Sequence, residues 1–103
     1  MSLTTVTYFN PKQISGCSLW LDGADTSSSS MTFSSGNTLS VWKDKSNTGN
    51  NFNVTTGPVT RTKDGNYPVV NIGANAVLTS VSQISLTTSS VFFIVCKLGG
   101  TTL

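Results

Sequence analysis

The chain has 103 residues, enough for one domain at most, and Ser, Thr and Asn together supply 41 of them. Because Ala occurs only three times and Glu not at all, the composition excludes a helical bundle or a coiled coil and indicates an all-β protein. The net charge of +2 is scattered along the chain, and no apolar run approaches the roughly 20 residues of a transmembrane helix, so we expect neither nucleic-acid binding nor membrane insertion.

Short apolar runs alternate with turn-rich stretches, a spacing typical of a β-sandwich or barrel. We expect strands over residues 3–9, 18–22, 31–33, 39–44, 52–54, 68–72 and 77–79. We expect turns at Asn10-Pro11, 34–37, 45–51, Gly57-Pro58 and Asp64-Gly65. Alternation within residues 39–44 predicts that Leu39 and Val41 share one face of their strand while Trp42 lies on the other.

The last third of the chain contains the strongest predicted strand. Residues 80–88 are interpreted as a single helical turn, with Val81, Ile84 and Leu86 directed inward. Residues 91–98 follow and are apolar on both faces. We therefore expect them in the middle of a sheet, with a neighbouring strand on each edge and material packed above and below.

The residue types that are absent exclude most catalytic mechanisms. Without His the chain lacks the usual general base, the commonest metal ligand and the middle member of a Ser-His-Asp triad. Glycoside hydrolysis requires two carboxylates facing one bond, and only Asp22 and Asp25 lie close together in the sequence. Both lie where a predicted strand runs into a turn, a position in which Asp ordinarily holds backbone N–H groups. We expect a protein that is not an enzyme.

Cys17 and Cys96 are too few ligands for a structural zinc site. A disulfide would require their two strands to meet. The first residues show neither a basic segment nor an apolar one, so we expect no secretory signal and favour reduced thiols.

Four blocks in order resemble the concanavalin A-like, or laminin-G-like, jelly-roll domains. Residues 14–25 resemble the opening "LWLDasD" of that family, and residues 41–51 are similar to its "W-x-D-k-S-G-n-g-N" element. Residues 68–73 fall where the family has a "p-v-v-x-F-d-G" strand, and residues 91–97 match its hydrophobic "tvf-vvfk" strand. The resemblance implies an antiparallel β-sandwich of the kind found in virion, phage-tail and bacterial surface proteins.

Two departures from the family bear on function. At Asn71-Ile72-Gly73 the aromatic residue and the aspartate of the family are replaced, which removes any ligand or ion role of that aspartate. The complete sandwich of the family also takes roughly twice this length, with two sheets packed about 10 Å apart. We therefore expect residues 1–103 to form one partial β-sandwich domain that further polypeptide, from the same chain or another, completes.

Trp20 and Trp42, with Asp22 and Asp25, are the candidate carbohydrate-binding residues. The two indoles could form a platform for a sugar ring, but the resemblance favours a structural role in which they cover the sheet.

Asp44, Ser46 and Asn47 resemble the opening of a calcium loop, although Thr55 stands where the closing Glu of such a loop would be. An Asp-capped turn is the commoner explanation, so we expect no cofactor and keep calcium as the alternative.

Two function classes follow. The first, which we favour, is a structural and interaction module whose partners are other protein chains, located at a virion or at a cell or particle surface. The second is a lectin-like module that recognises glycans.

Overall fold

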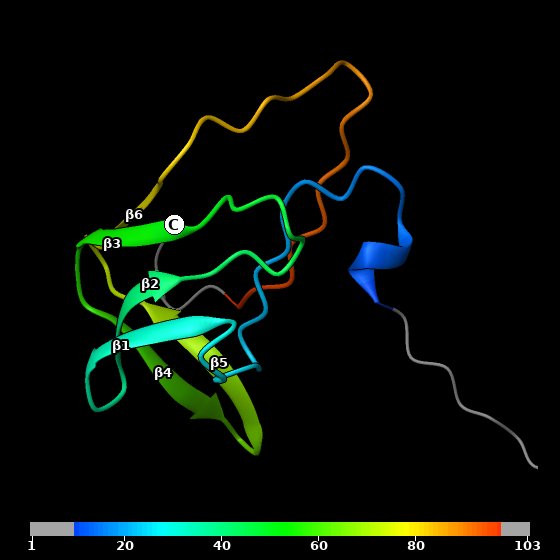
Figure 1. The fold of residues 1–103 in the computed structure, drawn as a ribbon. Coiled ribbons are helices and arrows are strands. Elements are labelled where there is room, and N and C mark those ends of the chain that lie inside the picture. Colours follow the sequence, from blue (N-terminus) through cyan, green and yellow to red (C-terminus); the bar gives the residue numbers. More distant parts are fainter. Residues whose placement is uncertain (1–9, 98–103) are drawn as a thin grey trace, which may run out of the picture.

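The computed structural model describes residues 10–97 and shows an all-β protein, as expected (Figure 1). A short 3-10 helix, η1 (Pro11–Gln13), begins the described chain, and Asn10 caps it by accepting a hydrogen bond from the backbone N–H of Lys12. Six strands follow: β1 (Met31–Ser35), β2 (Thr38–Trp42), β3 (Phe52–Thr56), β4 (Val59–Asp64), β5 (Tyr67–Ile72) and β6 (Val77–Ser80). Within these residues no helix is both long enough and apolar enough to cross a membrane.

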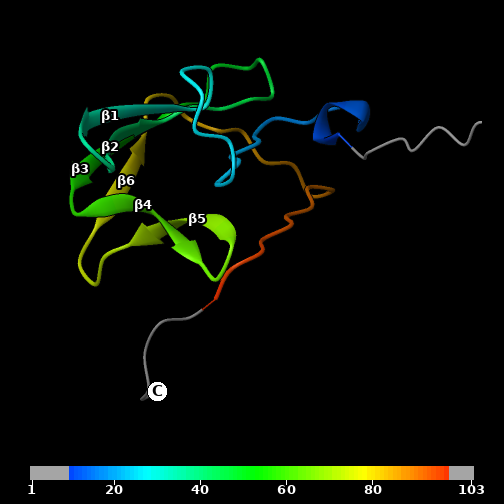
Figure 2. The ribbon, with the colours of Figure 1, turned by 90° about the horizontal axis from the view of Figure 1, so that it is seen from below.

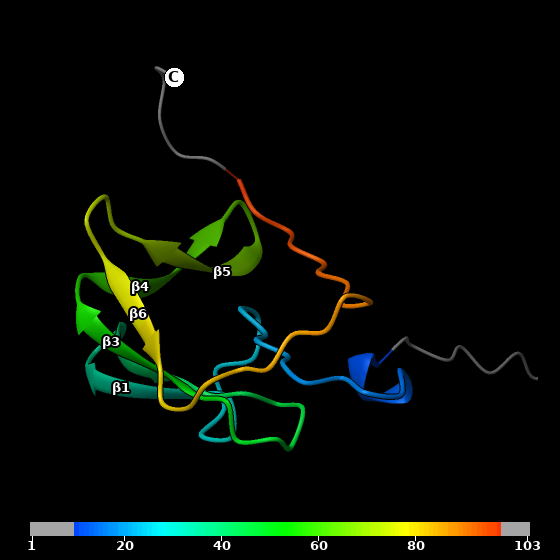
Figure 3. The ribbon, with the colours of Figure 1, turned by 90° about the horizontal axis from the view of Figure 1, so that it is seen from above.

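All six strands belong to one antiparallel sheet with β2 at its centre. The strand order is β5-β4-β2-β3-β6, and β1 also pairs with β2. Strand β3 pairs with the end of β2 through Trp42↔Phe52, whereas β4 pairs with its beginning through Thr38↔Thr60. The sheet therefore divides at β2 into two arms. Figures 2 and 3 show the β4–β5 arm facing β1, β2, β3 and β6, which gives the sheet its curled, sandwich-like form.

Two hairpins form where the sequence predicts turns. Ser35 faces Thr38 across a two-residue turn, and Asp64 faces Tyr67 across another. The first residue of each turn is a glycine with positive φ, +51° at Gly36 and +61° at Gly65. Such angles are readily adopted only without a Cβ atom, so the local sequence decides where these strands reverse.

The core is small and lies between the arms. Within residues 10–97 the buried apolar side chains are Met31, Leu39 and Val59. Partly buried side chains pack around them: Phe33, Trp42, Val54, Val70, Ala76 and Leu78.

The expected opposition of Leu39 and Trp42 is wrong, since both side chains contact this core. Thr32 pairs with Val41 but Phe33 pairs with Leu39, so an irregularity at Ser40 breaks the period-two alternation of β2.

Three other expectations are not met. Residues 18–22 and 91–97 are not strands, and residues 81–88 contain no helical turn. A strand requires a partner strand, and in the part of the chain that the structure describes neither apolar run has one. Val81 and Leu86, expected to face inward, are 54 % and 59 % exposed. The predicted strand over residues 3–9 and the last residue of 91–98 lie outside the described residues.

Leu39 offers a test of the core. Leu39→Ala should lower the free energy of unfolding by about 2–5 kcal/mol, because it empties space in a nearly solvent-free site. Leu86→Ala is the matched control, and at an exposed position it should cost less than about 0.5 kcal/mol. Urea unfolding of both variants measures the difference, and equal losses would contradict the placement of the core.

Candidate functional site

Asp44, which follows β2, is the centre of the largest hydrogen-bond network. Its Oδ1 accepts hydrogen bonds from the backbone N–H groups of Trp20 (2.9 Å) and Ser46 (2.8 Å). Its Oδ2 accepts from the Ser46 hydroxyl (2.8 Å), the Thr48 hydroxyl (2.7 Å) and the Asn50 backbone N–H (3.0 Å). Both carboxylate oxygens are thus fully engaged by donors of this chain.

These donors keep Asp44 ionised. Partial burial acts to raise the pKa of Asp44, but the hydrogen bonds from Thr48, Ser46 and Trp20 outweigh it and lower the pKa to about 2. A carboxylate with so low a pKa holds no proton near neutral pH. Asp44 therefore serves as an acceptor that organises the loop and not as a general acid.

Asn50 extends the network to two other parts of the chain. Its side chain is nearly buried, and its Nδ2 donates to the backbone carbonyl of Ser18 at 2.7 Å. Its Oδ1 accepts from the hydroxyl of Ser82 at 2.8 Å. The loop between β2 and β3 therefore fastens the segment before β1 and the segment after β6 to the sheet.

The calcium candidates are already engaged in this loop. Asp44 and Ser46 bond to each other, and the Oδ1 atom of Asn47 accepts from the ammonium group of Lys12 at 3.5 Å. The described residues contain no group of three or more His, Cys, Asp or Glu side chains arranged to hold a metal ion. This geometry favours the Asp-capped turn, and calcium stays the alternative, which the structure does not test.

Asp22 and Asp25 share a single lysine. The ammonium group of Lys45 lies 3.1 Å from Oδ2 of Asp22 and 2.8 Å from Oδ2 of Asp25. The Oδ1 atoms cap turns, accepting the backbone N–H groups of Ala24 and Ser27, each at 3.0 Å. Both carboxylates thus hold backbone N–H groups in turns, the arrangement that their place in the sequence suggests.

The charges in this cluster stabilise one another. The hydrogen bond from Lys45, followed by those from Ser27, lowers the pKa of Asp25 to about 2. For Lys45, partial burial acts to lower the pKa, but Asp25 and Asp22 raise it above its ordinary value. The general acid of a glycosidase needs a carboxyl pKa above its ordinary value. The pKa of Asp25 is shifted in the opposite direction.

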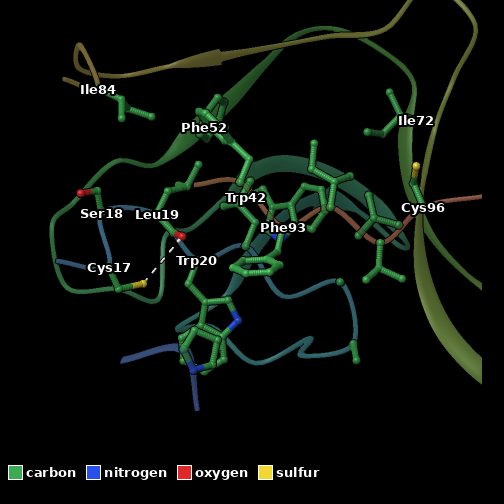
Figure 4. Close-up of a pocket in the computed structure, with 18 of the residues that line it drawn as sticks. Cys17, Ser18, Leu19, Trp20, Trp42, Phe52, Ile72, Ile84, Phe93 and Cys96 are labelled. Carbon is green, nitrogen blue, oxygen red and sulfur yellow. Dashed lines mark hydrogen bonds between the residues drawn. The ribbon is translucent and has the colours of Figure 1, made fainter. Parts of the chain in front are cut away.

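Trp20 and Trp42 line the same hollow, but neither is a free platform (Figure 4). The ammonium group of Lys45 lies 4.3 Å from the centroid of the Trp20 ring, so a cation covers one face of that ring. Trp42 packs against the core, and its buried Nε1 has no hydrogen-bond partner among the described residues. The structure brings the four predicted sugar-binding residues into one region, with Lys45 contacting three of them.

The hollow itself was not predicted from the sequence. It has a volume of about 1870 Å³, against roughly 300–1,000 Å³ for ordinary small-molecule sites. Residues 14–21, part of β5 and residues 84–87 and 89–97 line it. A hollow of this size is an open face of the domain that no second layer among the described residues covers. The signal in the sequence was the run at 91–95, apolar on both faces, whose side chains the structure leaves at least 65 % exposed.

Both cysteines line this hollow as free thiols. Figure 4 shows Cys17 on one side of the view and Cys96 beside Ile72 on the other. Cys17 is partly buried, and its sulfur lies 3.8 Å from the carbonyl oxygen of Leu19, whereas Cys96 is exposed.

Comparison with known proteins identifies no relative: no family model, curated protein or solved structure matches this chain.

The Asp44 network predicts a pH-dependent stability. Because folding lowers the pKa of Asp44 from 3.8 to about 2, its ionised form stabilises the fold above about pH 4, and this contribution is lost as the pH falls toward 2. Asp44→Asn should cost about 1–3 kcal/mol at neutral pH, because an ionised acceptor is replaced by an amide. The variant should also be less sensitive to acid than the native chain, although Asp25 keeps its own dependence.

Urea unfolding between about pH 7 and pH 2 measures both effects. Asp64→Asn is the control, because among residues 10–97 that exposed carboxylate makes only a surface pair, with Lys97 at 3.6 Å. A loss at neutral pH as small as that of the control would show that the network does not stabilise the fold.

Proposed function

We propose that this domain is a non-catalytic structural and interaction module, a partial β-sandwich completed by further polypeptide. One observation carries the proposal: the side chains of residues 91–95 are apolar and at least 65 % exposed. Contiguous apolar surface of this kind marks interaction sites in soluble proteins. Burying each such side chain would contribute about 1.5–3 kcal/mol, so a covering partner gains a large driving force.

The hollow beside this run has the chemistry of an unfinished layer. Apolar side chains from three separate segments line it, including Ile14, Val69 and Phe93. A sheet with such a face is stable when a second layer packs upon it at about 10 Å. The four blocks that resemble concanavalin A-like jelly rolls point to the same architecture, and the proteins in which that family occurs suggest a virion, phage-tail or surface assembly.

The lectin-like alternative rests on the two tryptophans in one hollow. Sugar recognition requires an aromatic face together with free polar groups that orient the hydroxyls. Here Lys45 lies over Trp20 and pairs with both Asp22 and Asp25. The polar groups closest to the platform bond to one another, which favours the interaction module.

Association should depend on residue 93. Sedimentation velocity of the whole chain should show concentration-dependent association, and Phe93→Ser should weaken it by roughly tenfold or more, since about 1.5–3 kcal/mol of apolar burial is lost. Tyr67→Ser is the matched control, because Tyr67 is an aromatic side chain of similar exposure, 76 % against 85 %, that does not line the hollow. A chain that is monomeric at every concentration, or an equal effect of both substitutions, would overturn the proposal.

The glycan alternative has its own measurement. A glycan array probed with the native chain should give no sugar-dependent binding. Binding that Trp20→Ala abolishes while circular dichroism stays unchanged would reverse the order of the two functions. Trp20 is the suitable position, because Trp42 packs against the core and its loss would also destabilise the fold.

A further inference from the structure

We propose that the partner is a second copy of this chain, and that residues 91–95 of the two copies pair as antiparallel strands about a two-fold axis at Phe93. The inference rests on the proposed function and adds the partner and the register. It follows from three properties of this segment: a backbone free of partners, a nearly symmetric order of side chains and the position of its one charge.

The backbone of residues 91–97 is available on both edges. Among the described residues, no hydrogen bond joins its N–H or C=O groups to the rest of the chain. The salt bridge between Lys97 and Asp64 holds one end, but both side chains are more than half exposed and such a pair contributes only about 0–1 kcal/mol. An apolar segment with two open edges is a template for a further strand.

The order Val-Phe-Phe-Ile-Val reads nearly the same in both directions. In antiparallel pairing centred on Phe93, Val91 of one protomer faces Val95 of its partner, Phe92 faces Ile94, and Phe93 faces Phe93. Every cross-strand pair is then aromatic or β-branched, a kind worth about 0.2–1 kcal/mol over alanine pairs. Because a two-fold axis repeats each contact, a single self-complementary segment supplies both halves of the interface.

The charge selects the antiparallel arrangement. Lys97 is the only charged residue within residues 89–97. In the proposed register it faces Ser89 of the partner, and the two ammonium groups lie at opposite ends of the ribbon. In-register parallel strands would instead place Lys97 against Lys97, which is destabilising. A glycan is a poor occupant, because residues 91–95 offer no polar side chain.

Disulfide trapping with two variants tests the register. In a Cys17→Ser/Cys96→Ser background, Val91→Cys and Val95→Cys each replace a valine by a residue of similar apolar character. The proposal predicts that mild oxidation of a mixture gives covalent dimers, roughly tenfold more than either variant alone. Directly opposed residues meet the distance needed for a disulfide, whereas the two copies of residue 95 lie about 14 Å apart in this register.

The outcomes separate this inference from the proposed function. Dimers trapped only in the mixture support antiparallel self-pairing. Dimers trapped equally well by each variant alone indicate parallel strands, and no trapping in a chain that still associates through Phe93 indicates another surface. Either result overturns the inference and leaves the interaction module standing. A chain that shows neither trapping nor association overturns both.

Discussion

The fold depends on how β2 shares one edge between two strands. Strand β3 bonds to the end of β2 and β4 to its beginning, so the two arms cannot continue as one flat sheet and instead face each other. This curl creates the space that holds Met31, Leu39 and Val59. The curl also limits the size of the core, because a single curled sheet buries side chains against itself only near β2, where its two arms diverge. The surface farther along β5 and the segments after β6 is left open.

Polar loops compensate for a core of this size. The carboxylate of Asp44 connects five donors from a loop and from the segment before β1, and Asn50 adds the segment after β6. Hydrogen bonds to an ionised group contribute about 1.5–3 kcal/mol each, similar to burying one large apolar side chain. The order of residues 18–20 and 82 beside the sheet therefore comes from polar contacts, which is consistent with a sequence rich in Ser, Thr and Asn.

The sequence predicted what is decided locally. The turns at 34–37 and 64–65 were expected because glycine provides the positive φ that each reversal needs, and β1, β2, β3, β5 and β6 overlap expected strands, whereas β4 was not expected. Features that depend on distant partners were not foreseen. Residues 18–22 and 91–97 have the composition of strands but pair with no strand in the described structure, and the irregularity at Ser40 moved Leu39 to the face of Trp42.

The same distinction applies to the candidate site. That Asp22, Asp25 and Asp44 would hold turns followed from their positions where a predicted strand runs into a turn or loop. The bridging role of Lys45 did not, because a lysine at the start of the predicted turn 45–51 gives no sign that it reaches across to Asp25 and to the ring of Trp20. Contacts of this kind depend on how the chain folds back.

The decisive question for function is which groups remain without a partner once these contacts are made. Around Trp20 the charged groups are already paired: Lys45 forms salt bridges with two carboxylates, and the oxygens of Asp44 are occupied by donors of the chain. A sugar would have to displace these interactions before making its own.

Along residues 91–97 the situation is reversed, since the backbone has no hydrogen-bond partner among the described residues and the side chains of 91–95 are exposed. A strand supplies both missing kinds of contact at once, main-chain hydrogen bonds along its edge and apolar side chains on its faces. Glycans and small molecules provide only part of this complement, and for that reason we propose polypeptide as the partner of this open surface.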